Sequence, residues 1–159
     1  MLSKIYDEIL SYFPEKIKEE VNRCNPDILD KACEIRIRAG CPIIISSYNN
    51  ETVIEYFVTT EDVLRILGNF SENSIYSIQN ELNSGFITIK GGHRIGISGT
   101  SIFEDEHIKN IKYISSLNIR IAREIKDCSL NVLSKICQNE FENTIIISPP
   151  RLWKNYSFT

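Results

Sequence analysis

The chain has 159 residues, of which 42% are hydrophobic and 25% are charged, a balance typical of a soluble globular domain with or without the start of another. Its net charge of -3 gives no overall basic surface for nucleic acid, so we expect no nucleic-acid partner. No apolar run approaches the ~20 residues that span a bilayer, and the amino terminus lacks a signal-peptide core. We therefore expect a cytoplasmic protein.

The cysteine content agrees with a reducing compartment. The five cysteines are an odd number, and no two of them form a C-x-x-C pair of the kind that ligates zinc. Buried reduced thiols are the expected state, and no metal site is predicted. The cysteines are Cys24, Cys33, Cys41, Cys128 and Cys137.

The first third of the chain changes from helical to strand periodicity. Apolar spacing predicts a helix over residues 3–13, a second helix that begins at Pro14, and a short third helix through Leu29 and Ala32. Strict alternation then predicts a half-buried strand over residues 34–38. Two further strands are predicted, with turns between them, at residues 43–45 and 52–58.

The middle of the chain returns to a helix and then to hairpins. Thr59 or Thr60 followed by acidic residues resembles a capping box at a helix start, and a second helix is predicted from Ser74 to Leu82, ending at Gly85. Alternation around Gly91-Gly92 predicts a hairpin. The remaining predicted elements are a hairpin-like pair at 108–114 and 117–123, a helix at 128–137 and a buried strand at 143–147. The fold class is therefore α+β.

Residues 91–99 are rich in glycine and contain Arg94. Glycines let backbone N–H groups approach an anion, and an arginine can pair with phosphate, which would suit an unrelated phosphate-binding enzyme. Glycines at a hairpin more often serve only to permit positive φ. His93 has no acid or nucleophile at motif spacing, so it is interpreted as a turn residue, and no catalytic residue is predicted.

The alternating segment around Arg120 and Arg123 allows two interpretations. Ile119 and Ile121 share one face, while Asn118 and Arg120 share the other, and Arg123 falls on the apolar side or past the strand end. Solvated arginines on an edge strand are the simpler interpretation. A phosphate-binding pair is the sharper one, because a planar guanidinium can donate two hydrogen bonds to phosphate.

The end of the chain begins like a P-loop but does not continue as one. A buried strand running into Ser148, Pro149 and Pro150 is how such a loop starts, but the loop then needs glycines and a lysine to hold phosphates. Residues 151–159 contain no glycine, and Leu152 and Trp153 are too bulky to let phosphate approach the backbone.

Four segments closely resemble the stage III sporulation protein AA family, and the resemblance covers nearly all of residues 1–150. They are EIRIRAGCP at 34–42, ITIKGGHRIGISG at 87–99, ISSLNIRIARE at 114–124 and TIIISPP at 144–150. The family is related to secretion and pilus ATPases. The resemblance implies an amino-terminal mixed helix and antiparallel-sheet domain like that of secretion ATPases, followed by the first helix and strand of a RecA-like ATPase domain.

The resemblance also implies partners and cofactors. Intact family members are expected to bind ATP and Mg²⁺, to form a homo-hexamer, and to energise a channel complex of other sporulation proteins at the membranes around the forespore. They work in the mother-cell cytoplasm or peripherally at its membrane. By resemblance, Arg94, Arg120, Arg123 and the segment Ser148-Pro149-Pro150 are candidates for nucleotide contact.

The departure after Pro150 suggests a frameshift. In the family, Ser-Pro-Pro is followed by Gly-Cys-Gly-Lys-Thr-Thr-Leu-Leu, and plausible codons for residues 151–159, shifted one base forward, encode those residues. We expect domain 1–127, the start of an ATPase domain at 128–150 and an out-of-frame tail at 151–159. Such a chain needs no cofactor and hydrolyses no ATP. The alternative is a stand-alone interaction module that docks on a sporulation channel complex or an intact ATPase.

Overall fold

The computed structural model describes residues 8–24, 27–71, 81–82, 84–104 and 107–122. The chain divides into two units, Met1–Ile121 and Ala122–Thr159, and every described helix and strand belongs to the first. The helix and strand predicted at 128–137 and 143–147, and the tail at 151–159, lie outside the described residues. The domain boundary expected at residue 127 stays a prediction.

The helices near the amino terminus agree only in part with the prediction: residues 3–7 of the first lie outside the described residues, and the third ends at Lys31, so that Ala32 belongs to a strand. The 3-10 turn η1 (Leu10–Tyr12) is followed by α2 (Glu15–Arg23), with Pro14 at the N-cap, and by the short α3 (Asp27–Lys31). Pro14 suits this place because the first N–H groups of a helix have no partner within it. Ile17 and Val21, one helical turn apart, are the buried residues of α2.

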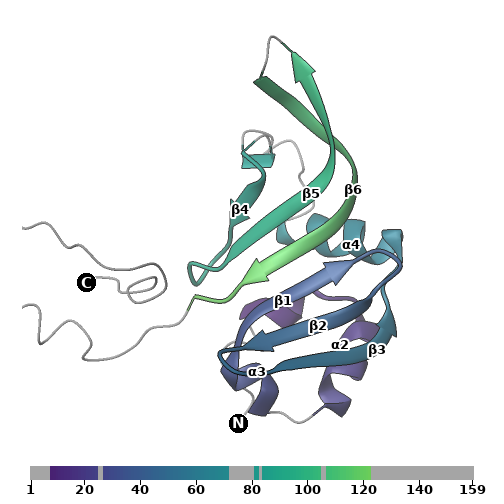
Figure 1. The fold of residues 1–159 in the computed structure, drawn as a ribbon, viewed down its shortest axis with the longest axis vertical. Helices are drawn as coiled ribbons and strands as arrows, with labels where there is room; N and C mark the ends of the chain where they lie inside the picture. Colours follow the sequence, from purple (N-terminus) through teal and green to yellow (C-terminus); the bar gives the residue numbers. More distant parts are fainter. Residues whose placement is uncertain (1–7, 25–26, 72–80, 83, 105–106, 123–159) are drawn as a thin grey trace, which may run out of the picture. The chain divides into compact units, whose positions relative to one another are not determined.

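The sheet has six strands in the order β3-β2-β1-β6-β5-β4, and all neighbouring pairs are antiparallel. This arrangement confirms the α+β class with a mixed helix and antiparallel-sheet domain (Figure 1). The strands, in chain order, are β1 (Ala32–Arg38), β2 (Pro42–Ser47), β3 (Glu51–Phe57), β4 (Phe86–Thr88), β5 (Arg94–Glu104) and β6 (His107–Arg120).

The hairpin predicted inside residues 108–123 is wrong. Residues 107–120 form one long strand, β6, which pairs with β5 along its whole length. The pairing is irregular where Ser98↔Ser116 gives way to Thr100↔Lys112, and Tyr113 there has a φ of 50°. A bulge therefore takes up the extra residues that the sequence suggested belonged to a turn.

One face of the sheet is a continuous apolar layer. A row of mutually paired isoleucines crosses five strands in the order β2-β1-β6-β5-β4, and each of them is almost completely buried. Helix α4 (Thr60–Phe70) packs on β6 and β1, while α2 packs on β3, and Figure 1 shows both helices behind the strands. The row consists of Ile45, Ile35, Ile119, Ile95 and Ile87.

The opposite face of the sheet, the polar face, carries the charged side chains of the strands together with apolar ones such as Val53. Side chains alternate along a strand, so the neighbours of the buried isoleucines point away from the helices. A row on this face pairs Ser46, Glu34, Arg120, Arg94 and Thr88 across five strands. Both Arg94 and Arg120 are exposed. The alternation that predicted Arg120 outward and Ile119 inward is confirmed.

The capping box predicted at the start of α4 is present. Thr59 is the N-cap: its hydroxyl accepts the backbone N–H of Asp62 at 3.1 Å, and Asp62 accepts the backbone N–H of Thr59 at 2.9 Å. Tyr56 also donates to Asp62 at 3.0 Å. Burial alone would raise the pKa of Asp62, but the hydrogen bonds from Thr59 and Tyr56 outweigh it, so that pKa is lowered.

Candidate anion-binding site

Arg94 and Arg120 lie directly opposite each other on the polar face of the sheet. They are Cα partners in the register of β5 and β6, although 26 positions separate them in the sequence. Cross-strand partners have Cβ atoms about 4.5–5.5 Å apart, so both side chains leave the sheet at the same place. The structure thus brings together two of the predicted nucleotide contacts.

These two arginines line a hollow of ≈ 340 Å³. Its wall is built from β4, β5 and β6 and from the turn that leads into β4. That volume is at the small end of the range for ligand sites and would admit a phosphate group or a small phosphate ester. The lining residues are Ser84, Gly85, Phe86, Arg94, Gly96, Asn118 and Arg120.

The Arg94 guanidinium lies over an aromatic ring. Its Cζ is 3.5 Å from the centroid of the Phe86 ring, which is within cation–π distance. Such a contact at an exposed site is worth about 0.5–1 kcal/mol. A contact of this kind acts through the positive charge and needs no hydrogen-bond acceptor, so guanidinium N–H groups remain for an anion.

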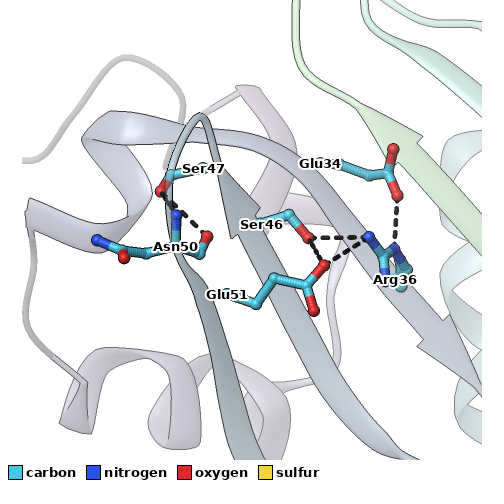
Figure 2. A network of polar contacts seen from close by, with 6 residues as sticks. All are labelled: Glu34, Arg36, Ser46, Ser47, Asn50 and Glu51. Atoms are coloured by element: carbon cyan, nitrogen blue, oxygen red, sulfur yellow. Dashed lines mark hydrogen bonds and ion pairs between the residues drawn. The ribbon is translucent and has the colours of Figure 1, made fainter.

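Arg36, the Cα partner of Asn118 on the same face, is an arginine whose charge is neutralised by nearby carboxylates. Arg36 donates from Nε to Glu34 at 2.6 Å and from a terminal nitrogen to Glu51 at 2.8 Å and to Ser46 at 3.2 Å (Figure 2). The Glu34 hydrogen bond, helped by Glu51, raises the pKa of Arg36 despite the opposing effect of burial. Two carboxylates therefore already satisfy this guanidinium.

Arg94 and Arg120 have no such carboxylate among the residues that the structure describes. Glu34 is the Cα partner of Arg120 on β1, but its Oε1 accepts from Arg36. Like charges directly opposite each other destabilise a sheet by a few tenths of a kcal/mol up to about 1 kcal/mol. An anion bound between the two guanidinium groups would remove that repulsion and accept hydrogen bonds from both.

Gly96 and Asn118 line the hollow two residues from the arginines on β5 and β6, and Gly96 lies opposite Phe86. They are Cα partners, and a Cβ added at Gly96 would meet Asn118 at only ordinary contact distances of 3.7 and 3.8 Å. Space, rather than backbone strain, is therefore what glycine provides at this position. Asn118 Oδ1 is buried without a hydrogen-bond partner among the described residues, which is costly for a carbonyl oxygen.

The glycine-rich turn has a backbone role. Gly91 and Gly92 have φ angles of 90° and 79°, which L side chains rarely adopt, and neither glycine lines the hollow. A Cβ at Gly91 would lie 2.8 Å from His93 Nε2. These glycines let β4 turn into β5 and so set the register that places Arg94 opposite Arg120.

His93 is buried, and its partner is far from it in the sequence. Its Nε2 lies 3.2 Å from Glu8 Oε2, a residue 85 positions earlier in the chain. Sequence spacing could not reveal this acid, because only the folded chain brings the two together. The pair joins the amino-terminal segment to the β4–β5 turn and does not line the hollow.

Other predicted features are partly outside the described residues. Arg123, Ser148, Pro149 and Pro150 all lie there. Cys24, Cys33 and Cys41 are free and half-buried, where buried thiols were expected. In the part of the chain that the structure describes, no three His, Cys, Asp or Glu residues gather as metal ligands, and no helix has the length and apolar character to cross a bilayer.

Two solved structures share a loosely similar fold. The ATPase DotB of Legionella pneumophila is 11% identical with a TM-score of 0.41, over 77% of this chain and 35% of that one. The VirB11 ATPase from the Brucella suis type IV secretion system, in complex with sulphate, is 17% identical with a TM-score of 0.40, over 82% of this chain and 37% of that one. Likeness at this level carries no functional conclusion.

Sequence relatives place the chain more firmly. A family model described as sporulation stage III, protein AA matches residues 4–157. The stage III sporulation protein AA of Bacillus subtilis (strain 168) is 34% identical over 148 residues, which cover 93% of this chain. The same alignment covers 48% of that relative, so this chain spans about half of its length. The chain belongs to the sporulation stage III, protein AA family.

Proposed function

We propose that this chain is the amino-terminal, non-catalytic part of a sporulation ATPase, and that Arg94 and Arg120 contact the phosphates of a nucleotide held by a P-loop domain. The observation that carries this proposal is the pair of cross-strand arginines in one hollow without a carboxylate partner among the described residues. Family membership supports the sporulation role. The resemblance of the four sequence segments to a family related to secretion ATPases supports the proposed ATPase activity.

The division of labour follows from the chemistry of phosphate. A P-loop wraps the phosphates with glycine N–H groups, neutralises them with a lysine and holds Mg²⁺ through a hydroxyl. This sequence has no glycine after Gly99, so it offers no such loop after the predicted strand at 143–147. Arg94 and Arg120 would instead add positive charge from outside the loop, as arginines do in many nucleotide hydrolases.

The assembled protein would work as a ring at a membrane. We expect the intact protein to bind ATP and Mg²⁺ on a RecA-like core, to form a homo-hexamer and to energise a channel complex of other sporulation proteins from the mother-cell cytoplasm. Movement of the amino-terminal domain would then be coupled to the nucleotide through the two arginines. The 159-residue chain alone is expected to hydrolyse no ATP and to need no cofactor.

Titration with inorganic pyrophosphate, followed by NMR, tests the arginine pair on the chain as it stands. Two exposed arginines without a P-loop should bind weakly, with a dissociation constant on the order of 1 mM. The double variant Arg94→Gln/Arg120→Gln should lose about tenfold or more in affinity, because each guanidinium donates charge-assisted hydrogen bonds. Micromolar binding of ATP by the wild-type chain would contradict the proposed absence of a complete nucleotide site.

Arg38 supplies the matched control for that titration. It is an exposed arginine of β1 on the same face of the sheet, paired with Ser116, and it does not line the hollow. Arg38→Gln removes the same charge as each hollow variant. It should change pyrophosphate affinity less than twofold at moderate salt, since screening weakens charges beyond about 10 Å. Equal losses in Arg38→Gln and in either single variant, Arg94→Gln or Arg120→Gln, would mean that only net charge matters.

An interaction module remains the second candidate, and exposed aromatic side chains favour it. Phe103 of β5 is 65% exposed and Tyr113 of β6 is 82% exposed, which leaves both rings available to a partner. Docking on an intact ATPase or a channel protein through them would not depend on Arg94 or Arg120. Co-purification with the intact relative, lost in Phe103→Ser/Tyr113→Ser and kept in Arg94→Gln/Arg120→Gln, would favour this function.

A further inference from the structure

The cation–π contact in the hollow depends on a specific cross-strand arrangement. Phe86 is the Cα partner of Gly96, and Arg94 lies two residues from Gly96 on the same face. Arg94 is therefore the diagonal neighbour of Phe86, a separation that an aromatic ring and a long side chain can bridge. Because Gly96 has no side chain, nothing from the directly opposite position stands between the ring and the guanidinium.

Two roles could explain an aromatic residue opposite a glycine. A ring that covers a cross-strand glycine stabilises a sheet edge, which would be a purely structural role. A ring that holds a guanidinium also reduces the freedom that the arginine must give up when it binds an anion. The 3.5 Å distance from Arg94 Cζ to the Phe86 centroid places the guanidinium against the ring, although the residue as a whole is exposed.

We propose that Phe86 is a positioning residue that holds the Arg94 guanidinium against the hollow, and that Gly96 keeps the hollow open for a phosphate-sized anion. This inference rests on the proposed function and adds to it the residues that orient the arginine and set the room available. Phe86 itself contacts no anion. Its effect passes through Arg94.

The experiment is a pyrophosphate titration of the 159-residue chain with its arginine side chains labelled for NMR. In the wild type, the Phe86 ring should shift the Arg94 Nε–H resonance upfield through its ring current. Phe86→Leu should abolish that shift and weaken pyrophosphate binding about two- to fivefold, the range that a cation–π contact supports. Phe86→Tyr keeps a ring and should keep both the shift and the affinity.

Gly96→Val gives an independent test that does not threaten the fold. The backbone there lies outside the left-handed region, and valine favours strands, so thermal stability should hold or rise. Its side chain would fill the space beside Arg94, and pyrophosphate binding should fall about tenfold or more, because a filled site excludes its ligand. Unchanged affinity in Gly96→Val would overturn the inference.

The outcomes distinguish a failure of this inference from a failure of the proposed function. If Phe86→Leu binds pyrophosphate as tightly as the wild type while Arg94→Gln/Arg120→Gln loses binding, the arginine site stands and the positioning role of Phe86 is refuted. If the double arginine variant binds pyrophosphate as tightly as the wild type, the proposed function is refuted. The present inference, which rests on it, is then refuted as well. Loss in Phe86→Leu that Phe86→Tyr does not share supports the positioning role.

Discussion

Asn118 shows, at the scale of one residue, that a buried polar group on a binding surface lowers the free energy of unfolding. Its Oδ1 is buried without a partner among the described residues, between Arg36 and Gly96 in the sheet register. A buried carbonyl oxygen without a hydrogen bond costs about 1–3 kcal/mol. A sheet built only for stability would place a β-branched residue at this position.

We therefore expect Asn118→Val to raise the free energy of unfolding by about 1 kcal/mol, since it removes the unpaired oxygen and adds strand propensity. Urea unfolding measures the change. Ser116→Val, two residues earlier on the same strand and face, is the control, because its gain comes from strand propensity alone. An Asn118→Val protein that is less stable than the wild type would show that the amide makes an important contact.

Which residues share a face could be predicted from the sequence, but which residues touch could not. Alternation placed Ile119 and Ile121 inside and Arg120 outside because side-chain direction in a strand depends only on parity. The contact of Phe86 with Arg94 depends on the register of β4 and β5, which the turn at Gly91-Gly92 sets. Alternation predicts only the face that each side chain takes, and leaves the pairing of the two strands to the geometry of that turn.

At the scale of elements, the start of α4 is determined by the local sequence. Local sequence predicted its start, because Thr59 and Asp62 satisfy each other's backbone N–H groups within one turn. The length of β6 could not be predicted in the same way. The strand continues past Ser115-Ser116 because it pairs with both β5 and β1. The irregular pairing near Tyr113 accommodates the extra residues without ending the strand.

Asp62→Ala should lower the free energy of unfolding at pH 7 by about 1 kcal/mol, because it removes the side chain that caps Thr59 N–H. The folded state lowers the pKa of Asp62 below the ordinary 3.8, so its contribution is complete above that value and is lost as pH falls through the folded-state pKa. The difference between variant and wild type should therefore vanish in strong acid. Urea unfolding over a pH series measures it.

Glu61→Ala is the control for that series. Glu61 lies in the same first turn, is exposed and pairs only with Arg65 at 2.8 Å. An exposed i,i+4 pair contributes about 0.3–0.5 kcal/mol, so this variant should change stability less than Asp62→Ala. A loss from Asp62→Ala that stays constant between pH 7 and strong acid would contradict the capping role.

At the scale of the whole molecule, the described core is contained in the first unit. All the buried apolar residues of the described part lie between Ile9 and Ile121. A fragment of residues 1–127 should therefore fold alone, and its amide NMR spectrum should overlay on that of the 159-residue chain for residues 8–120. A fragment that fails to fold would show that later residues complete the core.

The similarity to the Bacillus subtilis protein bears on where the proposed ATPase activity would lie. The chain matches 48% of that relative, and the proposed catalytic machinery would belong to the unmatched part. The resemblance of the sequence to the family suggests an ATPase. Only the structure shows that Arg94 and Arg120 line the same hollow.

The most direct measurement is steady-state ATP hydrolysis by a chimera that joins residues 1–150 to the remainder of the Bacillus subtilis relative. We predict that the 159-residue chain shows no turnover, that the chimera hydrolyses ATP, and that Arg94→Gln/Arg120→Gln in the chimera lowers kcat about tenfold or more. Turnover by the 159-residue chain, or a double-variant chimera as active as its parent, would contradict the account.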